Sequence, residues 1–145
     1  MFPMVSTIED FLDAKNYVNE IAEELDLKTP PLGIMVETPS SALMSDQFSE
    51  VVDFISIGTN DLTQYIMAAD RGNGNLSKYQ NPLHPAVLRA ISDVINNCRK
   101  NKIEVSVCGE MASDPMSALA LYILAERLTN LKFPMDILKL LKNLV

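Results

Sequence analysis

The sequence predicts an α/β fold, a sheet of parallel strands with helices packed outside it. Short apolar runs alternate along the chain with longer segments whose apolar residues recur at helical spacing, and this alternation is typical of parallel sheets. The runs are apolar on both sides, as strands buried on both faces are. The 145 residues, 48% of them hydrophobic and 21% charged, have the length and composition of one globular domain rather than of a disordered chain.

The expected elements begin with a short strand at 2–4 and a helix after it. Ser6 and Glu9 have the S-x-x-E spacing of a capping box, in which each side chain binds a free amide at a helix start. Apolar residues then recur at helical spacing from Ile8 to Leu25. The prolines at 30–31 end this segment, because proline cannot continue a helix.

The next two strands are expected at 32–36 and 52–57. Prolines flank the first of them, and Pro39 can occupy the first position of a short helix after it. The second runs through a polar turn into a helix at 62–69. Residues 71–81 then carry two glycines and several polar side chains, which is the composition of a loop.

A helix beginning at Pro85 has the clearest periodicity in the chain. Its apolar stripe consists of Val87, Leu88, Ile91, Val94, Ile95 and Cys98. Residues 103–107 alternate between apolar and polar and form the fourth expected strand. Pro115 begins another helix, a weak extended stretch covers 128–133, and Pro134 begins the last helix.

Charge and cysteine content exclude several classes of function. With 12 basic and 19 acidic side chains the net charge is −7, which argues against nucleic acid or an anionic membrane as a partner. An anionic substrate would therefore need a bridging cation. Two cysteines without metal-site spacing favour a reducing, cytoplasmic setting. No run approaches the roughly 18 apolar residues of a membrane span, and the N-terminus lacks the pattern of a signal peptide.

Polar residues follow three of the expected strands. They are Glu37, the pair Asn60 and Asp61, and the segment Cys108-Gly109-Glu110. In barrels and open α/β sheets this edge collects the loops that bind substrate. Glu37 and Asp61 would together suit Mg²⁺, which takes one or two protein carboxylates. Each also has a plainer interpretation, Glu37 as a solvated carboxylate before a helix and Asp61 as a helix N-cap.

Arg71 follows the helix after Asp61 and could clamp a phosphate or carboxylate with two hydrogen bonds. The alternative is a surface salt bridge with Asp70 or Asp93.

The remaining chemical candidates are two cysteines and one histidine. Cys98 falls on an apolar helix face and is expected in the core. Cys108 stands at a strand end beside Gly109, but cysteine is so often buried that spacing alone favours a structural thiol. His84 precedes Pro85 at a helix start, where a capping role is favoured over a catalytic one.

Four segments in this order resemble a known family. They are GIMVETP at 33–39, FISIGTNDLTQY at 54–65, DRGN at 70–73 and CGEMA at 108–112. The resemblance is to the phosphoenolpyruvate-binding domain of enzyme I, the phosphoenolpyruvate–protein phosphotransferase of the bacterial phosphotransferase system. LHPAVLRA at 83–90 and SVC at 106–108 resemble the nitrogen-related branch more than the sugar branch.

The resemblance implies that residues 1–145 form part of a phosphoenolpyruvate/pyruvate-type (β/α)8 barrel. Since such a barrel has about 250 residues, the chain would supply about four to five of the eight units, the later ones. By the same resemblance, Glu37 and Asp61 bind Mg²⁺, Asn60 and Arg71 hold phosphoenolpyruvate, and Cys108 donates a proton to the enolate carbon. The implied reaction is phosphoryl transfer from phosphoenolpyruvate to a protein histidine.

Departures from the family leave other functions open. The phosphate-binding arginines of the earlier strands and the phosphorylated histidine have no counterpart here, since His84 matches a different position. We therefore expect the isolated chain to be inactive and to meet a phosphocarrier protein only through further domains. Exposed strand edges predict a dimer or larger homo-oligomer. The alternatives are a fragment of pyruvate phosphate dikinase or phosphoenolpyruvate synthase, which the wording at 64–65 and 70–73 disfavours, and a non-catalytic barrel remnant that acts as a binding or dimerisation module.

Overall fold

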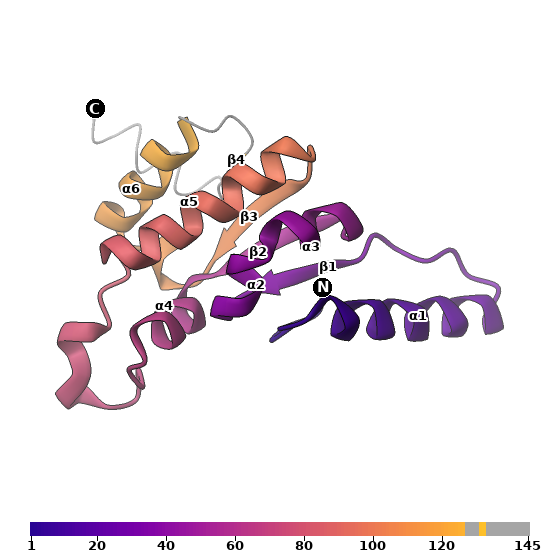
Figure 1. Ribbon diagram of the computed structural model, residues 1–145, viewed down its shortest axis with the longest axis horizontal. Coiled ribbons are helices and arrows are strands. Elements are labelled where there is room, and N and C mark those ends of the chain that lie inside the picture. The colour runs from indigo at the N-terminus through magenta and orange to yellow at the C-terminus, as the bar shows by residue number, and fades with distance from the viewer. Residues whose placement is uncertain (127–130, 133–145) are drawn as a thin grey trace.

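The computed structural model describes residues 1–126 and 131–132. Its described strands form one parallel sheet in the order β1-β2-β3-β4, with helices on the connections between them (Figure 1). The strands are β1 (Gly33–Val36), β2 (Phe54–Gly58), β3 (Glu104–Cys108) and β4 (Leu131–Lys132). The helices are α1 (Ile8–Glu24), α2 (Pro39–Leu43), α3 (Ser45–Val51), α4 (Thr59–Met67), α5 (Pro85–Lys100) and α6 (Pro115–Glu126), with short 3-10 helices at Gly74–Tyr79 and Glu110–Ala112. The predicted α/β class is confirmed.

Strand register divides the side chains between the two faces of the sheet. Ile34, Ile55 and Val105 share one row across β1, β2 and β3, and all three are buried in the core. They pack with side chains of α3 and α5, which lie against each other over this face. Because successive side chains point to opposite faces, the next row, Met35, Ser56 and Ser106, faces away from these helices.

The expected strand at 2–4 is reduced to a single bridge. Phe2 pairs with Ile34 in parallel, donating its N–H to Gly33 and accepting one from Met35. Pro3 has no N–H to continue the ladder, and Met4 has a φ of 54°. The other three expected strands are confirmed to within two residues at each end. β4 falls within the weak stretch at 128–133, whereas the helix expected from Pro134 lies outside the described residues.

The first helix begins one residue later than predicted. Thr7, not Ser6, is its N-cap, and Asp10 completes the capping box with bonds of 3.1 and 3.0 Å between side chains and backbone amides. Phe11 is buried and its ring meets that of Phe2 edge to face. Leu25 is 61% exposed, and α1 lies beside the sheet and projects past β1 (Figure 1).

Helix α5 has the predicted core face. Val87, Ile91, Val94, Ile95 and Cys98 are all buried, and Leu88 is partly buried against them. Burial raises the pKa of the Cys98 thiol to about 12. No helix in the described part of the chain is long and apolar enough to cross a membrane.

Candidate functional site

The carboxyl ends of β1, β2 and β3 bring two of the predicted site residues, Glu37 and Cys108, to one edge of the sheet. Gly58 lies opposite Cys108 in the register of β2 and β3. Glu37 follows the last residue of β1, and a Cβ placed on Gly58 would lie 2.8 Å from its Oε2. Glu37, Gly58 and Cys108 therefore form one row, on the face away from the helices of the core. The missing side chain at Gly58 leaves room for the Glu37 carboxylate.

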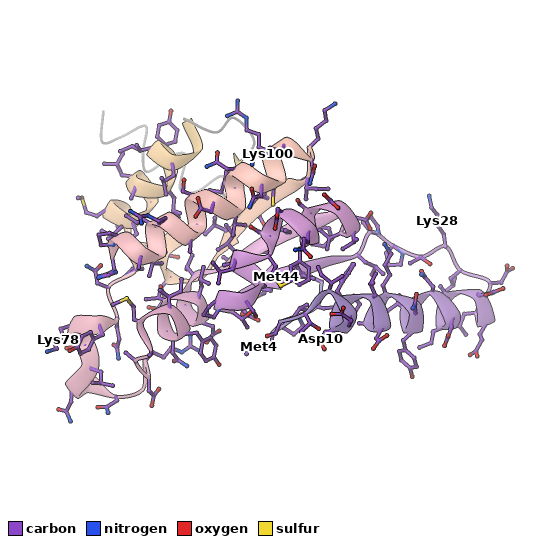
Figure 2. The ribbon with its side chains drawn as sticks, in the orientation of Figure 1. Met4, Asp10, Lys28, Met44, Lys78 and Lys100 are labelled. Carbon is purple, nitrogen blue, oxygen red and sulfur yellow. The ribbon has the colours of Figure 1, made fainter. Side chains whose placement is uncertain are left out.

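Glu37 is a buried carboxylate, 4% exposed, so its interpretation as a solvated side chain is wrong. Its Oε1 accepts a 2.7 Å hydrogen bond from the backbone N–H of Met4, a residue labelled in Figure 2. Within residues 1–126 it forms no ion pair with a basic side chain. Buried charges are normally paired or bound to a metal, so Glu37 fits a site that takes a cation.

The turn from β2 into α4 is fixed to the end of β3. The Thr59 hydroxyl donates to the carbonyl of Cys108 at 3.0 Å, and Asn60 Oδ1 accepts the N–H of Glu110 at 3.0 Å. Gly109 sits between these contacts with a φ of +106°, and a Cβ there would lie 2.5 Å from the Thr59 hydroxyl. Both the backbone conformation and the space therefore require glycine. Hydrogen bonds therefore join the predicted residues after β2 to those after β3.

Helix α4 begins at Thr59, directly after β2, with Gly58 as its N-cap and no capping side chain. Asp61 is therefore the third residue of the helix, and its interpretation as the N-cap is wrong. Its Oδ1 lies 3.8 Å from a guanidinium nitrogen of Arg71. The predicted alternatives for Arg71, ion pairs with Asp70 or Asp93, are also wrong, since Asp61 is the partner in the described structure.

The Arg71 side chain is 55% exposed and its backbone is held from two sides. Gln64 accepts the Arg71 N–H at 3.1 Å through its side-chain oxygen, and Gln80 donates to the carbonyls of Asp70 and Asn73. This segment and the 3-10 helix after it, which carries Lys78, extend away from the sheet (Figure 2).

A cavity of about 210 Å³ lies between α4, this loop and the end of β3. Its lining includes Asn60, Thr63, Arg71 and Glu110. Thr63 is 5% exposed, and its hydroxyl has no hydrogen-bond partner among the described residues. Such a buried hydroxyl fits a polar molecule in the cavity. The cavity is therefore a polar space between the two residues predicted to hold an anion.

Cys108 is half-buried, unlike the fully buried Cys98. Its Sγ accepts from the Ser56 hydroxyl and donates to the carbonyl of Ile57, both at 3.5 Å. His84 is the N-cap of α5 and accepts the N–H of Ala86 at 3.2 Å through Nδ1, so the predicted capping role is confirmed.

Sequence reasoning missed Ser56, Thr63, Gln64 and Gln80 as parts of this edge. One of the four carried a signal, because Ser56 is the only polar residue within the buried run of β2. The contacts of the others depend on how the loop at 70–84 folds back. No three carboxylate, thiol or imidazole side chains converge on a metal-sized site anywhere in the described residues.

The fold and the position of the candidate site define a class of protein. It is an α/β domain whose candidate site residues lie at the carboxyl ends of parallel strands. The arrangement is similar to that in the crystal structure of a citrate lyase from Burkholderia xenovorans, with a TM-score of 0.66 over 93% of this chain and 44% of that one. At 17% identity this likeness concerns the fold alone. Residues 1–131 match the family model described as PEP-utilising enzyme, PEP-binding domain. The chain belongs to this family.

Several relatives are phosphoenolpyruvate-protein phosphotransferases. Those of Haloferax volcanii and Mycoplasma capricolum are each 47% identical over 120 residues, covering 79% of this chain and 21% of theirs. A Salmonella typhimurium protein named phosphoenolpyruvate-dependent phosphotransferase system is 38% identical over 133 residues, covering 88% of this chain and 18% of that protein. The chain thus spans about a fifth of the length of these relatives. Their names do not separate the nitrogen-related from the sugar branch.

Proposed function

We propose that this chain supplies the metal-binding and proton-donating part of an enzyme I-type site for phosphoryl transfer from phosphoenolpyruvate to a protein histidine. One observation carries the proposal. The three strand ends that hold Glu37, Asn60 with Asp61, and Cys108 meet at one edge, and among the described residues the buried carboxylate of Glu37 forms no ion pair with a basic side chain. The names of the relatives support the same reaction.

The metal of this proposal is Mg²⁺, held by Glu37 and Asp61. Oxygen ligands from one or two carboxylates are what Mg²⁺ takes in proteins that bind phosphorylated substrates. When bound, the ion would neutralise charge on the phosphoryl group and on the enolate oxygen. Glu37 is preorganised for this role, because its Oε1 is fixed by the Met4 amide while Oε2 lies beside Gly58.

The substrate anion would lie between Asn60 and Arg71, which line the same cavity. The 3.8 Å contact between Arg71 and Asp61 is long and partly exposed, so it holds the guanidinium weakly. Arg71 can therefore turn from Asp61 to a phosphate, with which an arginine forms stronger paired hydrogen bonds. Asp61 would then be released from its ion pair to bind the metal.

Cys108 is the proton donor in this proposal. Loss of the phosphoryl group leaves the enolate of pyruvate. The S–H bond then breaks, a C–H bond forms at the methylene carbon of this enolate, and pyruvate and a thiolate result. The thiolate regains its proton from water. A cysteine thiol is one of the side chains that can act as a general acid in proton transfer.

Exchange of pyruvate methyl protons tests the proposal without a phosphoryl acceptor. The isolated chain is expected to be inactive in phosphoryl transfer, because it lacks the phosphate-binding arginines and the phosphorylated histidine. The reverse of the Cys108 step needs neither of these and removes a methyl proton, so the chain should incorporate deuterium into pyruvate in D₂O with Mg²⁺, followed by NMR. Cys108→Ala and Glu37→Gln should abolish this exchange, and Cys98→Ala, at the buried thiol, is the matched control. Exchange that is equally fast in Cys108→Ala would refute the role of Cys108.

The remaining details belong to the same proposal. The phosphocarrier protein would be reached through further domains of the kind that make up the rest of the relatives. The assignment to the nitrogen-related branch rests on the sequence at 83–90 and 106–108. We also propose self-association, because large apolar side chains such as Leu27 (63% exposed) and Leu43 (82% exposed) are uncovered.

A further inference from the structure

We infer that Ser56 is a positioning residue for Cys108, which holds the thiol in place before proton transfer and stabilises the thiolate left after it. The inference rests on the proposed role of Cys108 as a proton donor. It concerns a side chain inside β2 that lies outside the row of strand-end residues.

The contact follows from the strand register. Gly58 lies opposite Cys108, and Ser56 is two residues earlier on β2, so the side chains of Ser56 and Cys108 share one face of the sheet. The Ser56 hydroxyl donates to Cys108 Sγ at 3.5 Å.

Ser56 has no other visible reason to be polar. It is 5% exposed and its neighbours Ile55 and Ile57 are fully buried. Within residues 1–126 the bond to Cys108 is the one hydrogen bond of its hydroxyl. A buried hydroxyl without a partner is costly, so this serine is accounted for by the sulfur it contacts.

The thiol is oriented by two opposed hydrogen bonds. Sγ donates its proton to the carbonyl of Ile57 and accepts the proton of Ser56, while the Cys108 carbonyl is held by Thr59. When the thiol gives up its proton, the bond to Ile57 is lost, and among residues 1–126 the Ser56 hydroxyl is the one hydrogen-bond donor to the sulfur. A neutral thiol is a weak acceptor, whereas a bond to an ionised acceptor is about twice as strong as a neutral one. Ser56 therefore favours the product of proton donation over the resting thiol.

Alkylation by iodoacetamide measures this contact without any substrate. We expect Ser56→Ala to lower the thiolate fraction of Cys108 about tenfold, equivalent to about 1.4 kcal/mol. The thiolate that remains is more basic and therefore more nucleophilic, with a Brønsted slope near 0.4–0.5, which offsets part of this loss. The alkylation rate near neutral pH should therefore fall about threefold. Ser56→Thr keeps the hydroxyl and should restore the rate. Peptide mass spectrometry separates Cys108 from Cys98.

The matched control is Ser106→Ala. Ser106 pairs with Ser56 in the register and faces the same side of the sheet, but no hydrogen bond joins it to Cys108 in the described structure. An alkylation rate in Ser56→Ala equal to that of the unmodified chain, or an equal loss in Ser106→Ala, would overturn the inference. Circular dichroism verifies that each variant folds.

Pyruvate exchange in D₂O separates this inference from the proposed function. We expect Ser56→Ala to slow exchange and Ser56→Thr to restore it. If Cys108→Ala leaves exchange unchanged, the proposed function fails, and the alkylation result alone still reports the contact. If Cys108→Ala abolishes exchange while Ser56→Ala does not alter it, the proposed function stands and the inference about Ser56 is wrong.

Discussion

Replacing Glu37 by glutamine should stabilise the metal-free chain and remove its response to Mg²⁺. Glutamine has nearly the same shape, and its side-chain oxygen can still accept the Met4 N–H that Oε1 accepts at 2.7 Å. The substitution removes a charge that is 4% exposed and has no basic partner in the described structure. In EDTA we therefore expect the free energy of unfolding to rise by about 1–3 kcal/mol, a part of the several kcal/mol that an uncompensated buried ion costs.

Magnesium should stabilise the unmodified chain and leave the stability of Glu37→Gln unchanged. A ligand that binds only the folded state stabilises it by RT ln(1 + [L]/Kd), which at ten times Kd is about 1.4 kcal/mol. For a chain of this size that corresponds to a midpoint shift of roughly 5 °C. The unmodified chain should show this shift and Glu37→Gln should not, so the two should approach each other in stability as Mg²⁺ is added.

Chemical denaturation in EDTA and in Mg²⁺, at matched ionic strength, measures the free energies of unfolding, and thermal unfolding under the same conditions measures the midpoint shift. Glu20→Gln, on the exposed surface of α1, is the control for the loss of one negative charge. Equal stabilisation of Glu37→Gln and the unmodified chain by Mg²⁺ would refute the role of Glu37 as a ligand. Destabilisation of Glu37→Gln in EDTA would refute the argument that its charge lacks compensation.

Three further predictions concern stability and assembly. Burial raises the pKa of the Cys98 thiol to about 12 from 9.0, so as pH rises this thiol ionises in the unfolded chain before it ionises in the folded one. The free energy of unfolding should therefore fall as pH rises from 9 towards 12. Denaturation curves should show a smaller fall in Cys98→Ala, and an equal fall would contradict this. Hydrogen bonds from Thr7 lower the pKa of Asp10, so the stability that they add to the folded chain is lost as Asp10 is protonated at acid pH. Thr7→Ala should therefore cost about 1 kcal/mol near neutral pH and less at low pH. The same cost at both pH values would contradict this dependence of stability on Asp10. Light scattering should show a dimer or larger species, and Leu25→Glu with Leu27→Glu should weaken it; a monomer at high concentration would refute self-association.

The order of elements was predictable because glycine and proline mark most of the boundaries. Pro39, Pro85 and Pro115 each stand at the first position of a helix, where the fixed φ of proline is favourable. The predictions that failed concern choices between adjacent residues. Ser6 with Glu9 and Thr7 with Asp10 have equivalent capping chemistry, and local sequence does not decide between them. The strand at 2–4 failed because one backbone N–H was missing and the next residue turned to positive φ.

The sequence predicted which residues lie at the candidate site better than it predicted the contacts between them. Glu37, Asn60, Asp61 and Cys108 were found because parallel strands place their carboxyl ends at one edge, a consequence of topology that periodicity already indicates. The partner of Arg71 was not found, since it depends on how the loop carrying Gln80 returns to α4. Whether Asp61 and Glu37 share one ion stays a prediction.

The contacts of Cys108 depend on strand register, which the core determines. The buried row that contains Ile34 and Ile55 must face α3 and α5. This leaves Ser56 and Cys108 together on the other face of the sheet. A slip of one residue in β3 would exchange its two faces, placing the apolar side chains of Val105 and Val107 at the site and the thiol in the core. Such a slip would bury Ser106 and expose valines, so the hydrophobic effect disfavours it strongly. The position of the proposed proton donor is therefore specified by Val105 and Val107, the buried apolar residues that precede it on β3.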